Sequence, residues 1–310
     1  MSKVVDSVIG LAIGDAMGVP TQFHPRRWLL ANPIKEMTEP IKEGQPVGAW
    51  SDDTSMTVCT IESYIEKDKF DYDDIMTKFV NWINNADYTS AGKTFDVGRT
   101  CLKAISKYMD CVSPIDCGLT DEKSNGNGSL MRILPVALYA YYKKLSDEEI
   151  INLTNDISSL THAHEISKLG CYIYVRYVMF LLEGHTKEEA YELIKKVNYS
   201  SYAHSSIDAY NRILKDNIVK YSIDDIDSTG YVVSTLECAL WILLKSKSFE
   251  ETIFATTNIG NDTDTIGAIA GSMAGIIYGY DNIPIRWLDK LLRKDYLIDI
   301  SKQFEDKINI

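Results

Sequence analysis

The chain has 310 residues, 45% of them hydrophobic, which is enough for a sizeable core in one large domain or two ordinary ones. It carries 32 Lys and Arg against 44 Asp and Glu, so the formal net charge is −12. This acidic balance argues against a nucleic-acid backbone or an anionic membrane as the main partner. A small anionic ligand stays possible, because a local pocket can oppose the overall field.

The six cysteines contain no Cys-x-x-Cys pair and lie in apolar segments, which predicts reduced core thiols in a cytoplasmic protein. The N-terminal stretch VVDSVIGLAIG is interrupted by Asp6 and lacks a basic leader, so we expect no signal peptide. The longest apolar run, 266–280, is short and Gly-rich for a membrane span, so we expect no membrane partner.

Apolar residues recur at helical spacing along most of the chain, and no clear alternation of period two is present. Capping boxes at Ser146, Thr186 and Ser248, each with Glu three residues on, mark three helix starts. The other expected helices are 54–66, 73–85, 97–109, 129–143, 165–183, 206–216, 231–246, 266–279, 284–294 and 296–308. We therefore predict an all-α fold of a dozen or so helices, in a single domain covering residues 1–310.

Four segments do not resemble helix bodies, because they are rich in Gly, Asp, Asn and Pro: 14–24, 44–53, 87–98 and 117–129. Loops of this kind on a rigid helical frame commonly carry the chemistry of a protein.

Two acidic pairs each stand before an apolar helix: Asp52 and Asp53 in WSDDTSMT, and Asp262 and Asp264 in GNDTDT. The simplest interpretation is that each pair caps its own helix, where the dipole favours acids. Alternatively the two helix starts pack together, and four carboxylates in one place then need a cation.

The helix after the second pair carries a side-chain-poor stripe at Gly267, Gly271 and Gly275, so its backbone can approach a neighbour closely. An all-oxygen set suits Mg²⁺ or Mn²⁺. Zinc fits less well, because His162 and His164 form the only close His pair and lack a companion set of ligands. An EF-hand loop starting at Asp262 fails as well, since its fifth and twelfth positions are apolar.

Two Gly-rich segments remain open between structural and functional interpretations. GLAIGDAMGVPTQF, residues 10–23, is expected to contain a tight turn under the site. SNGNGSLMRILP, residues 124–135, offers exposed N–H groups and a helix starting at Ser129, which together predict an anion site or an ordinary turn. Arg132 either reaches the ligand or pairs with a buried acid.

Three further side chains are candidates. Asp96, between Phe95 and Val97, is either a helix cap or a functional carboxylate with a shifted pKa. His162 ends a helix, either as a C-cap or as a phosphate contact. Tyr231, directly after Gly230, could stack on a base.

The motifs GLAIGDAMGVPTQF, WSDDT, FDVG, NGNGSLMRILP, THAH and GNDTDTIGAIAG stand in an order that resembles the ADP-ribosylglycohydrolase family, from about residue 6 to residue 280. The resemblance implies a single orthogonal multi-helix bundle with two Mg²⁺ or Mn²⁺ ions. The implied metal ligands are Ser51, Asp52, Asp53, Asp262, Asp264 and Thr265. The implied diphosphate contacts are Asn125, Gly126, Asn127, Gly128, Ser129 and His162. Met131 is a further implied substrate contact, and Tyr231 lies toward the adenosine end.

The resemblance also implies a hydrolase that removes ADP-ribose from an ADP-ribosylated protein. FDVG matches a motif of the arginine-cleaving branch, so we expect cleavage of the N-glycosidic bond of ADP-ribosylarginine. Asp53 is the candidate for activating water, and Asp96 for proton handling at the leaving guanidine. The alternatives are another ADP-ribose conjugate (serine, a nucleic-acid base or a metabolite) or a non-catalytic relative that binds ADP-ribose.

The chain departs from the family pattern at two places. Gln22 stands where the family commonly has Glu, so a role of that carboxylate in catalysis or metal binding is not expected here. Asn261 stands where Gly is common, and its side chain can alter the width of the pocket.

Overall fold

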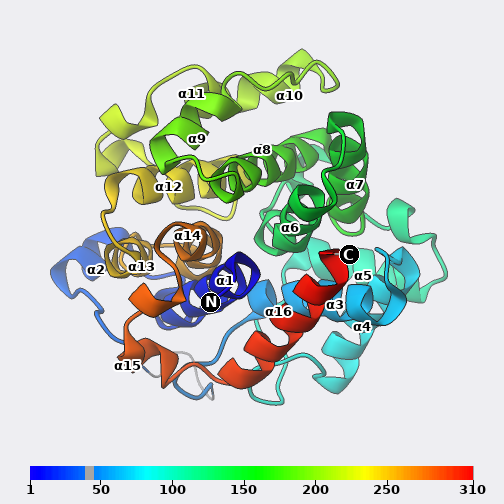
Figure 1. Cartoon of the computed structure of the whole chain (residues 1–310), viewed down its shortest axis with the longest axis horizontal. Coiled ribbons are helices and arrows are strands. Elements are labelled where there is room, and N and C mark those ends of the chain that lie inside the picture. The colour runs from blue at the N-terminus through cyan, green and yellow to red at the C-terminus, as the bar shows by residue number, and fades with distance from the viewer. Residues whose placement is uncertain (39–44, 310) are drawn as a thin grey trace.

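Two helices, α1 (Lys3–Gly18) and α14 (Thr263–Tyr278), lie side by side in the middle of the computed structural model, which describes residues 1–38 and 45–309 (Figure 1). A Cβ added to Gly14 would lie 1.9 Å from the carbonyl oxygen of Gly267, and one on Gly271 would lie 2.2 Å from that of Gly10. The helices therefore touch backbone to backbone. The predicted glycine stripe is confirmed, and its neighbour is α1 rather than the helix bearing the first acidic pair.

The other helices pack around this pair (Figure 1). In chain order they are α2 (Arg26–Ala31), α3 (Asp52–Lys67), α4 (Tyr72–Asn85), α5 (Arg99–Met109), α6 (Leu134–Lys143), α7 (Asp147–Ser159), α8 (Glu165–Leu182), α9 (Lys187–Ile194), α10 (His204–Ala209), α11 (Asn211–Leu214), α12 (Val232–Lys245), α13 (Phe249–Thr257), α15 (Ile285–Leu288) and α16 (Lys294–Ile308). The described residues form two isolated β-bridges and no strand, which confirms the all-α prediction.

The structure corrects several predicted element boundaries. The expected loop 14–24 is helical to Gly18, and α2 was not predicted. The expected helix 206–216 is divided at Tyr210, 284–294 contains only one helical turn, and 129–143 opens with a 3-10 turn. The predicted segment 44–53 falls partly outside the described residues, and α3 begins at its end.

The predicted helix starts at the capping boxes are present. Ser146 and Thr186 form complete boxes with their Glu partners. Ser248 caps the N–H of Glu251, but the Glu251 carboxylate accepts from the N–H of Lys247 instead of that of Ser248. That box is therefore only half formed.

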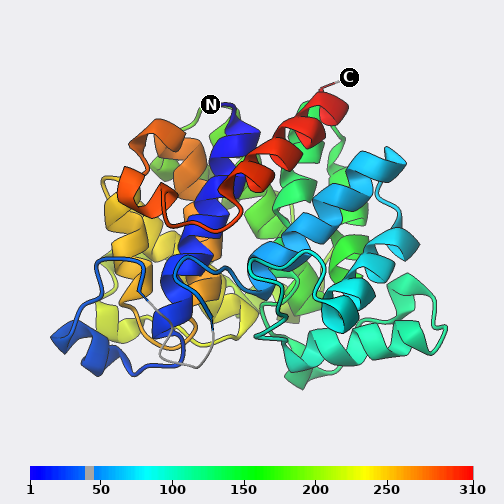
Figure 2. The same ribbon diagram turned by 90° about the horizontal axis from the view of Figure 1, so that it is seen from below.

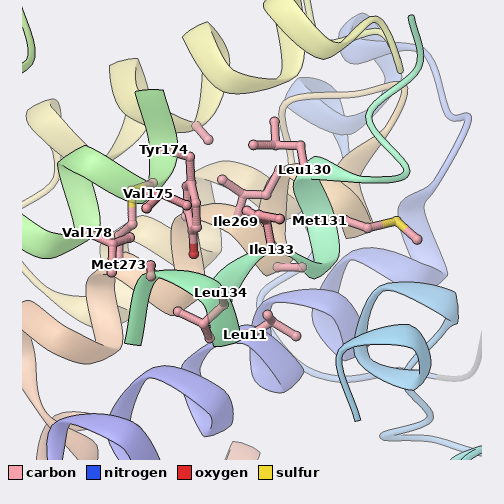
Figure 3. Close-up of a cluster of buried hydrophobic side chains, with 14 of the residues drawn as sticks. Leu11, Leu130, Met131, Ile133, Leu134, Tyr174, Val175, Val178, Ile269 and Met273 are labelled. Atoms are coloured by element: carbon pink, nitrogen blue, oxygen red, sulfur yellow. The ribbon is translucent and has the colours of Figure 1, made fainter. Parts of the chain in front are cut away.

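The core is continuous across the central helices. Figure 3 shows Leu11 of α1, Tyr174 and Val178 of α8 and Ile269 of α14 around one cluster. The Tyr174 hydroxyl lies 2.7 Å from the Ser272 hydroxyl, which satisfies this polar end within the core. The side chain of Met131 points away from the cluster (Figure 3).

Five of the cysteines are buried, as predicted, whereas Cys111 is exposed, and all six are free thiols. The cytoplasmic location inferred from them stays a prediction. The segment Lys3–Thr21 is long and apolar enough to cross a membrane, but 94% of its apolar 18-residue window is buried inside the protein. It therefore has the character of a core helix.

The two termini lie on one side of the molecule, and α1 runs from that side toward the opposite one (Figure 2). There the last turn of α1 meets the starts of α3 and α14: the backbone N–H of Ser51 donates to Asp15, and a Cβ on Gly18 would lie 2.3 Å from Cα of Asp264. Segments two hundred residues apart in sequence thus converge at one end of α1.

Candidate active site

Asp15, on α1, fixes the start of α3. Its carboxylate accepts from the backbone N–H groups of Ser51 and Thr54, at 2.9 and 3.1 Å, and from the Thr54 hydroxyl at 2.6 Å. Burial is the main reason why the pKa of Asp15 is raised to about 6, and these hydrogen bonds oppose the rise. The fully buried Asp15 is therefore an anchor under the site, in a helix rather than in the expected turn.

The two acidic pairs face each other across the starts of α3 and α14. Ser51 is the N-cap of α3, and its hydroxyl also donates to Asp53 at 3.0 Å. Thr265 donates weakly to the same carboxylate, at 3.5 Å. Asp262 occupies the N-cap position of α14 without capping it, and accepts instead from the Asn127 amide at 2.6 Å. Simple capping therefore accounts for the first helix start but not for the second.

Several of these carboxylates are buried without a partner. Asp53 and Asp264 are fully buried, and neither Oδ1 of Asp53 nor either oxygen of Asp264 accepts a hydrogen bond from any described residue. Burial followed by repulsion from neighbouring carboxylates raises the pKa of both groups well above its usual range. Burying charge without a partner is costly, so these oxygens need a cation or a proton.

The chemistry of this donor set fits hard divalent cations, because every candidate ligand is a carboxylate or hydroxyl oxygen. As they stand, however, no three His, Cys, Asp or Glu side chains among the described residues form a group able to hold a metal ion. A bound cation would therefore have to draw these carboxylates together. The orphaned oxygens of Asp53 and Asp264 are the groups available to do so.

A cleft of about 480 Å³ opens beside the carboxylates. It is lined by many of the residues predicted from sequence: Asp52, Asp96, Gly126, Asn127, Gly128, Met131, His162, Asp262 and Thr265. Its walls thus combine one member of each acidic pair with the Gly-rich loop. Ser51, Asp53 and Asp264 lie behind its surface.

The Gly-rich loop is held by backbone pairing with the start of α12. The N–H of Asn127 donates to the carbonyl of Gly230 at 3.0 Å, and the N–H of Val232 donates to that of Asn125 at 3.0 Å. The N–H groups of Gly126, Gly128 and Ser129 make no hydrogen bond to any residue in the described part of the chain. Free N–H groups on one loop can bind an anion without a cationic side chain.

Asp96 lies on the cleft wall in a left-handed conformation, with φ of 57°, which few non-glycine residues adopt. The amide of Gln22 donates to its Oδ2. Gln22 therefore orients Asp96 without adding a negative charge, a role that the sequence did not indicate. Asp96 is also not the helix cap, since α5 is capped by Gly98.

The structure decides between the alternative interpretations of His162 and of Arg132. His162 lines the cleft, two residues beyond the C-cap of α7, so the C-cap interpretation is wrong and the phosphate contact stays a prediction. Arg132 is fully buried and lies outside the cleft lining, and among the described residues it forms no ion pair with an acid. Both interpretations of Arg132 are therefore wrong, and its side chain donates to Ile157 and Thr161.

Some predicted residues contribute only through the backbone or from behind the cleft. The Asn125 side chain bonds Ser167 and Glu122, and the Ser129 hydroxyl bonds Ser158. Tyr231 is 40% exposed beside Gly126 but does not line the cleft.

Sequence reasoning missed cleft residues: Gln22, Phe23, Arg99 and Lys123. Arg99 directly follows the FDVG motif, and this position was the one feature of the sequence that could have indicated Arg99 as a cleft residue.

The fold and the site define an all-helical protein with a carboxylate-rich cleft beside a Gly-rich loop that has free N–H groups. The family model described as ADP-ribosylglycohydrolase matches residues 1–309. The chain therefore belongs to the ADP-ribosylglycohydrolase family and is a hydrolase of that family.

Named relatives agree with this assignment. The chain is 31% identical over 303 residues to ADP-ribosylarginine hydrolase Tri1 of Serratia proteamaculans (strain 568), covering 98% of this chain and 79% of that one. It is 30% identical to ADP-ribosyl-[dinitrogen reductase] glycohydrolase of Rhodospirillum rubrum, covering 93% and 90%. A solved structure, an ADP-ribosylglycohydrolase-related protein complex, superposes with a TM-score of 0.83 at 26% identity, covering 99% and 98%.

Proposed function

We propose that the protein cleaves the N-glycosidic bond of ADP-ribosylarginine in modified proteins, releasing ADP-ribose. The observation that carries this proposal is that one cleft is lined by Asp96 and by Gly126 and Gly128, whose N–H groups make no hydrogen bond to any described residue. The loop suits a diphosphate, and the carboxylate suits proton transfer at a leaving guanidine. The relatives named for acting on ADP-ribosylarginine support the choice of linkage.

We also propose that two Mg²⁺ or Mn²⁺ ions are held by Asp52, Asp53, Asp262 and Asp264 with the hydroxyls of Ser51 and Thr265. The buried oxygens without partners support this assignment. Such ions would supply positive charge that binds the ribose hydroxyls and neutralises the clustered carboxylates.

The side chains of the cleft divide the remaining work. The N–H groups of Gly126 and Gly128, with His162, hold the diphosphate. Asp96 takes a proton from the water that attacks the anomeric carbon. The carbon–nitrogen bond breaks with its electron pair going to the guanidine nitrogen. Because the substituted guanidinium is already charged, it leaves as neutral guanidine, which then takes the proton from Asp96.

Asp53 has a different role in this scheme from the one expected from sequence. It is fully buried and does not line the cleft, so it is poorly placed to touch an attacking water. We therefore assign Asp53 to cation binding alone and proton transfer to Asp96, whose orientation Gln22 maintains.

The test is release of ADP-ribose from an ADP-ribosylarginine peptide, followed by mass spectrometry, with Mg²⁺ and then with EDTA. We expect turnover with Mg²⁺, loss of turnover with EDTA, and a loss of at least 100-fold in the Asp96→Asn variant, since general acid–base catalysis contributes roughly 10²–10⁴-fold. Asp306→Asn removes the same charge at an exposed position on α16, and it should leave turnover unchanged.

Each element of the proposal has its own contrary result. Turnover that persists in EDTA contradicts the metal assignment. Turnover on serine-linked but not arginine-linked ADP-ribose contradicts the linkage. Tight binding of ADP-ribose with no turnover on either conjugate indicates the non-catalytic alternative.

A further inference from the structure

A buried arginine lies next to the cleft but does not reach it. Arg132 is fully buried, its Nη2 donates to the carbonyl of Ile157 at 3.1 Å and to the hydroxyl of Thr161 at 2.8 Å, and its guanidinium lies 5.1 Å from the centre of the Phe79 ring. Its Nε and Nη1 have no hydrogen-bond partner within the described ranges. A buried cation left so incompletely paired is expensive, so its retention needs a reason.

Thr161 joins this arginine to the cleft histidine. Its fully buried hydroxyl lies 2.9 Å from Nδ1 of His162. An arginine can only donate, so the Thr161 oxygen must accept from Arg132, and its single proton remains to be placed. That proton can go to Nδ1 of His162 or to the nearby sulfur of Cys101. Sulfur is a weak acceptor and an imidazole nitrogen a strong one, so the histidine is favoured.

The other ring nitrogen faces the Gly-rich loop. A Cβ on Gly126 would lie 3.5 Å from Nε2 of His162, and one on Gly128 would lie 3.4 Å from it and 2.8 Å from Cε1. The ring lines the cleft, and Nε2 bonds to none of the described residues. Glycine at both positions therefore leaves this nitrogen open toward a ligand on the loop.

We propose that Arg132 and Thr161 are positioning residues: they hold neutral His162 with its proton on Nε2, so that the ring donates a hydrogen bond to an anionic phosphate oxygen on the Gly-rich loop. The identity of the anion, the diphosphate of ADP-ribose, rests on the proposed function. Burial, and then the nearby charge of Arg132, lower the pKa of His162 to about 3, so the ring is uncharged at neutral pH. In the other tautomer, with the proton on Nδ1, the neutral ring would present a lone pair to the anion.

Two measurements test this inference. In protein with ¹⁵N-labelled histidine, the ¹⁵N NMR chemical shifts of the His162 ring report which nitrogen carries the proton. These signals are assigned as the ones that are missing from the spectrum of the His162→Asn variant. We expect the proton on Nε2. Calorimetric titration with ADP-ribose should show affinity about tenfold weaker in Thr161→Val, which is a loss of about 1.4 kcal/mol, and within about twofold of the original in Thr161→Ser.

Thr154→Val is the matched control. Thr154 lies on α7, is equally buried, and its hydroxyl has no hydrogen-bond partner among the described residues. The same chemical change there should leave both the tautomer of His162 and the affinity for ADP-ribose unchanged. If Thr161→Val does not fold, the inference is tested by the tautomer of His162 in the unmodified protein and by the affinity of Thr161→Ser for ADP-ribose.

A proton on Nδ1, or a Thr161→Val variant that matches Thr154→Val in affinity, overturns the inference even if the protein hydrolyses ADP-ribosylarginine. Conversely, absence of hydrolysis together with the expected tautomer and affinities counts against the proposed function alone. Failure of ADP-ribose to bind the unmodified protein overturns both.

Discussion

Asp264 shows how this chain uses buried charge. It sits in the first turn of α14, fully buried, and no described residue donates to either of its oxygens. Asp15, also fully buried, accepts from two backbone N–H groups and a hydroxyl, and the pKa of Asp15 rises only to about 6. Both are buried, but hydrogen bonds lower the pKa of Asp15, whereas repulsion from Asp262, Asp96 and Asp53 raises that of Asp264 further. Asp15 therefore has a structural role, and Asp264 lacks a positive partner.

We therefore predict that Asp264→Asn stabilises the metal-free protein. The change removes a buried charge that is repelled by Asp262, Asp96 and Asp53, and the free energy of unfolding in EDTA should rise by roughly 1–3 kcal/mol at neutral pH. Urea denaturation monitored by circular dichroism measures it, with Asp306→Asn as the surface control. A clear loss of stability instead would mean that Asp264 serves as a structural cap.

At the scale of elements, sequence patterns located most of the helices but misjudged α1, which is buried on every side. In α1, every residue from Val4 to Gly18 is buried, so it has no polar face to reveal a helical period, and its three glycines suggested a turn. The expected helix 206–216 breaks at Tyr210, whose hydroxyl donates to the carbonyl of Ile166 on the neighbouring helix. Such tertiary contacts override local propensity and leave no trace in spacing.

The contact between α1 and α14 makes a sharp prediction for Gly14→Ala. The new Cβ would meet the carbonyl of Gly267, a backbone atom that cannot turn aside, so the helices must separate. We expect a loss of roughly 3 kcal/mol in the free energy of unfolding. Hydrolysis should fall as well, because α1 carries the Asp15 anchor of α3.

Gly98→Ala is the control for this prediction. Gly98 has an ordinary φ of −60°, and among the described residues an added Cβ would meet only the sulfur of Cys101, at 3.9 Å. Its effect on stability should stay below about 1 kcal/mol. Equal stability of both variants in urea would show that the two central helices can separate without cost.

At the scale of the whole molecule, the sequence indicated which residues bring oxygen ligands but not how they share the work. Pairs of acids before an apolar helix revealed Asp52, Asp53, Asp262 and Asp264. Their division between the cleft surface and its floor depends on the direction of each side chain, which no spacing encodes. The amide of Gln22 on Asp96 was equally hidden, because the two residues are 74 positions apart.

Because the helix starts of α3 and α14 hold like charges at one end of α1, cation binding should stabilise the entire fold. An ion that binds only the folded chain contributes about 2.7 kcal/mol at a hundred times its dissociation constant. Titrating Mg²⁺ into EDTA-treated, dialysed protein should therefore raise the thermal unfolding temperature by several degrees. Asp264→Asn should begin from a higher temperature and respond less.

Ionic strength must be matched in this experiment, because salt alone screens repulsion between carboxylates. NaCl at equal ionic strength should give only a small shift, since the buried oxygens of Asp53 and Asp264 are shielded from the diffuse ion atmosphere. If NaCl reproduces the effect of Mg²⁺, the ions act by screening rather than by binding, and the acidic helix starts have no specific cation site.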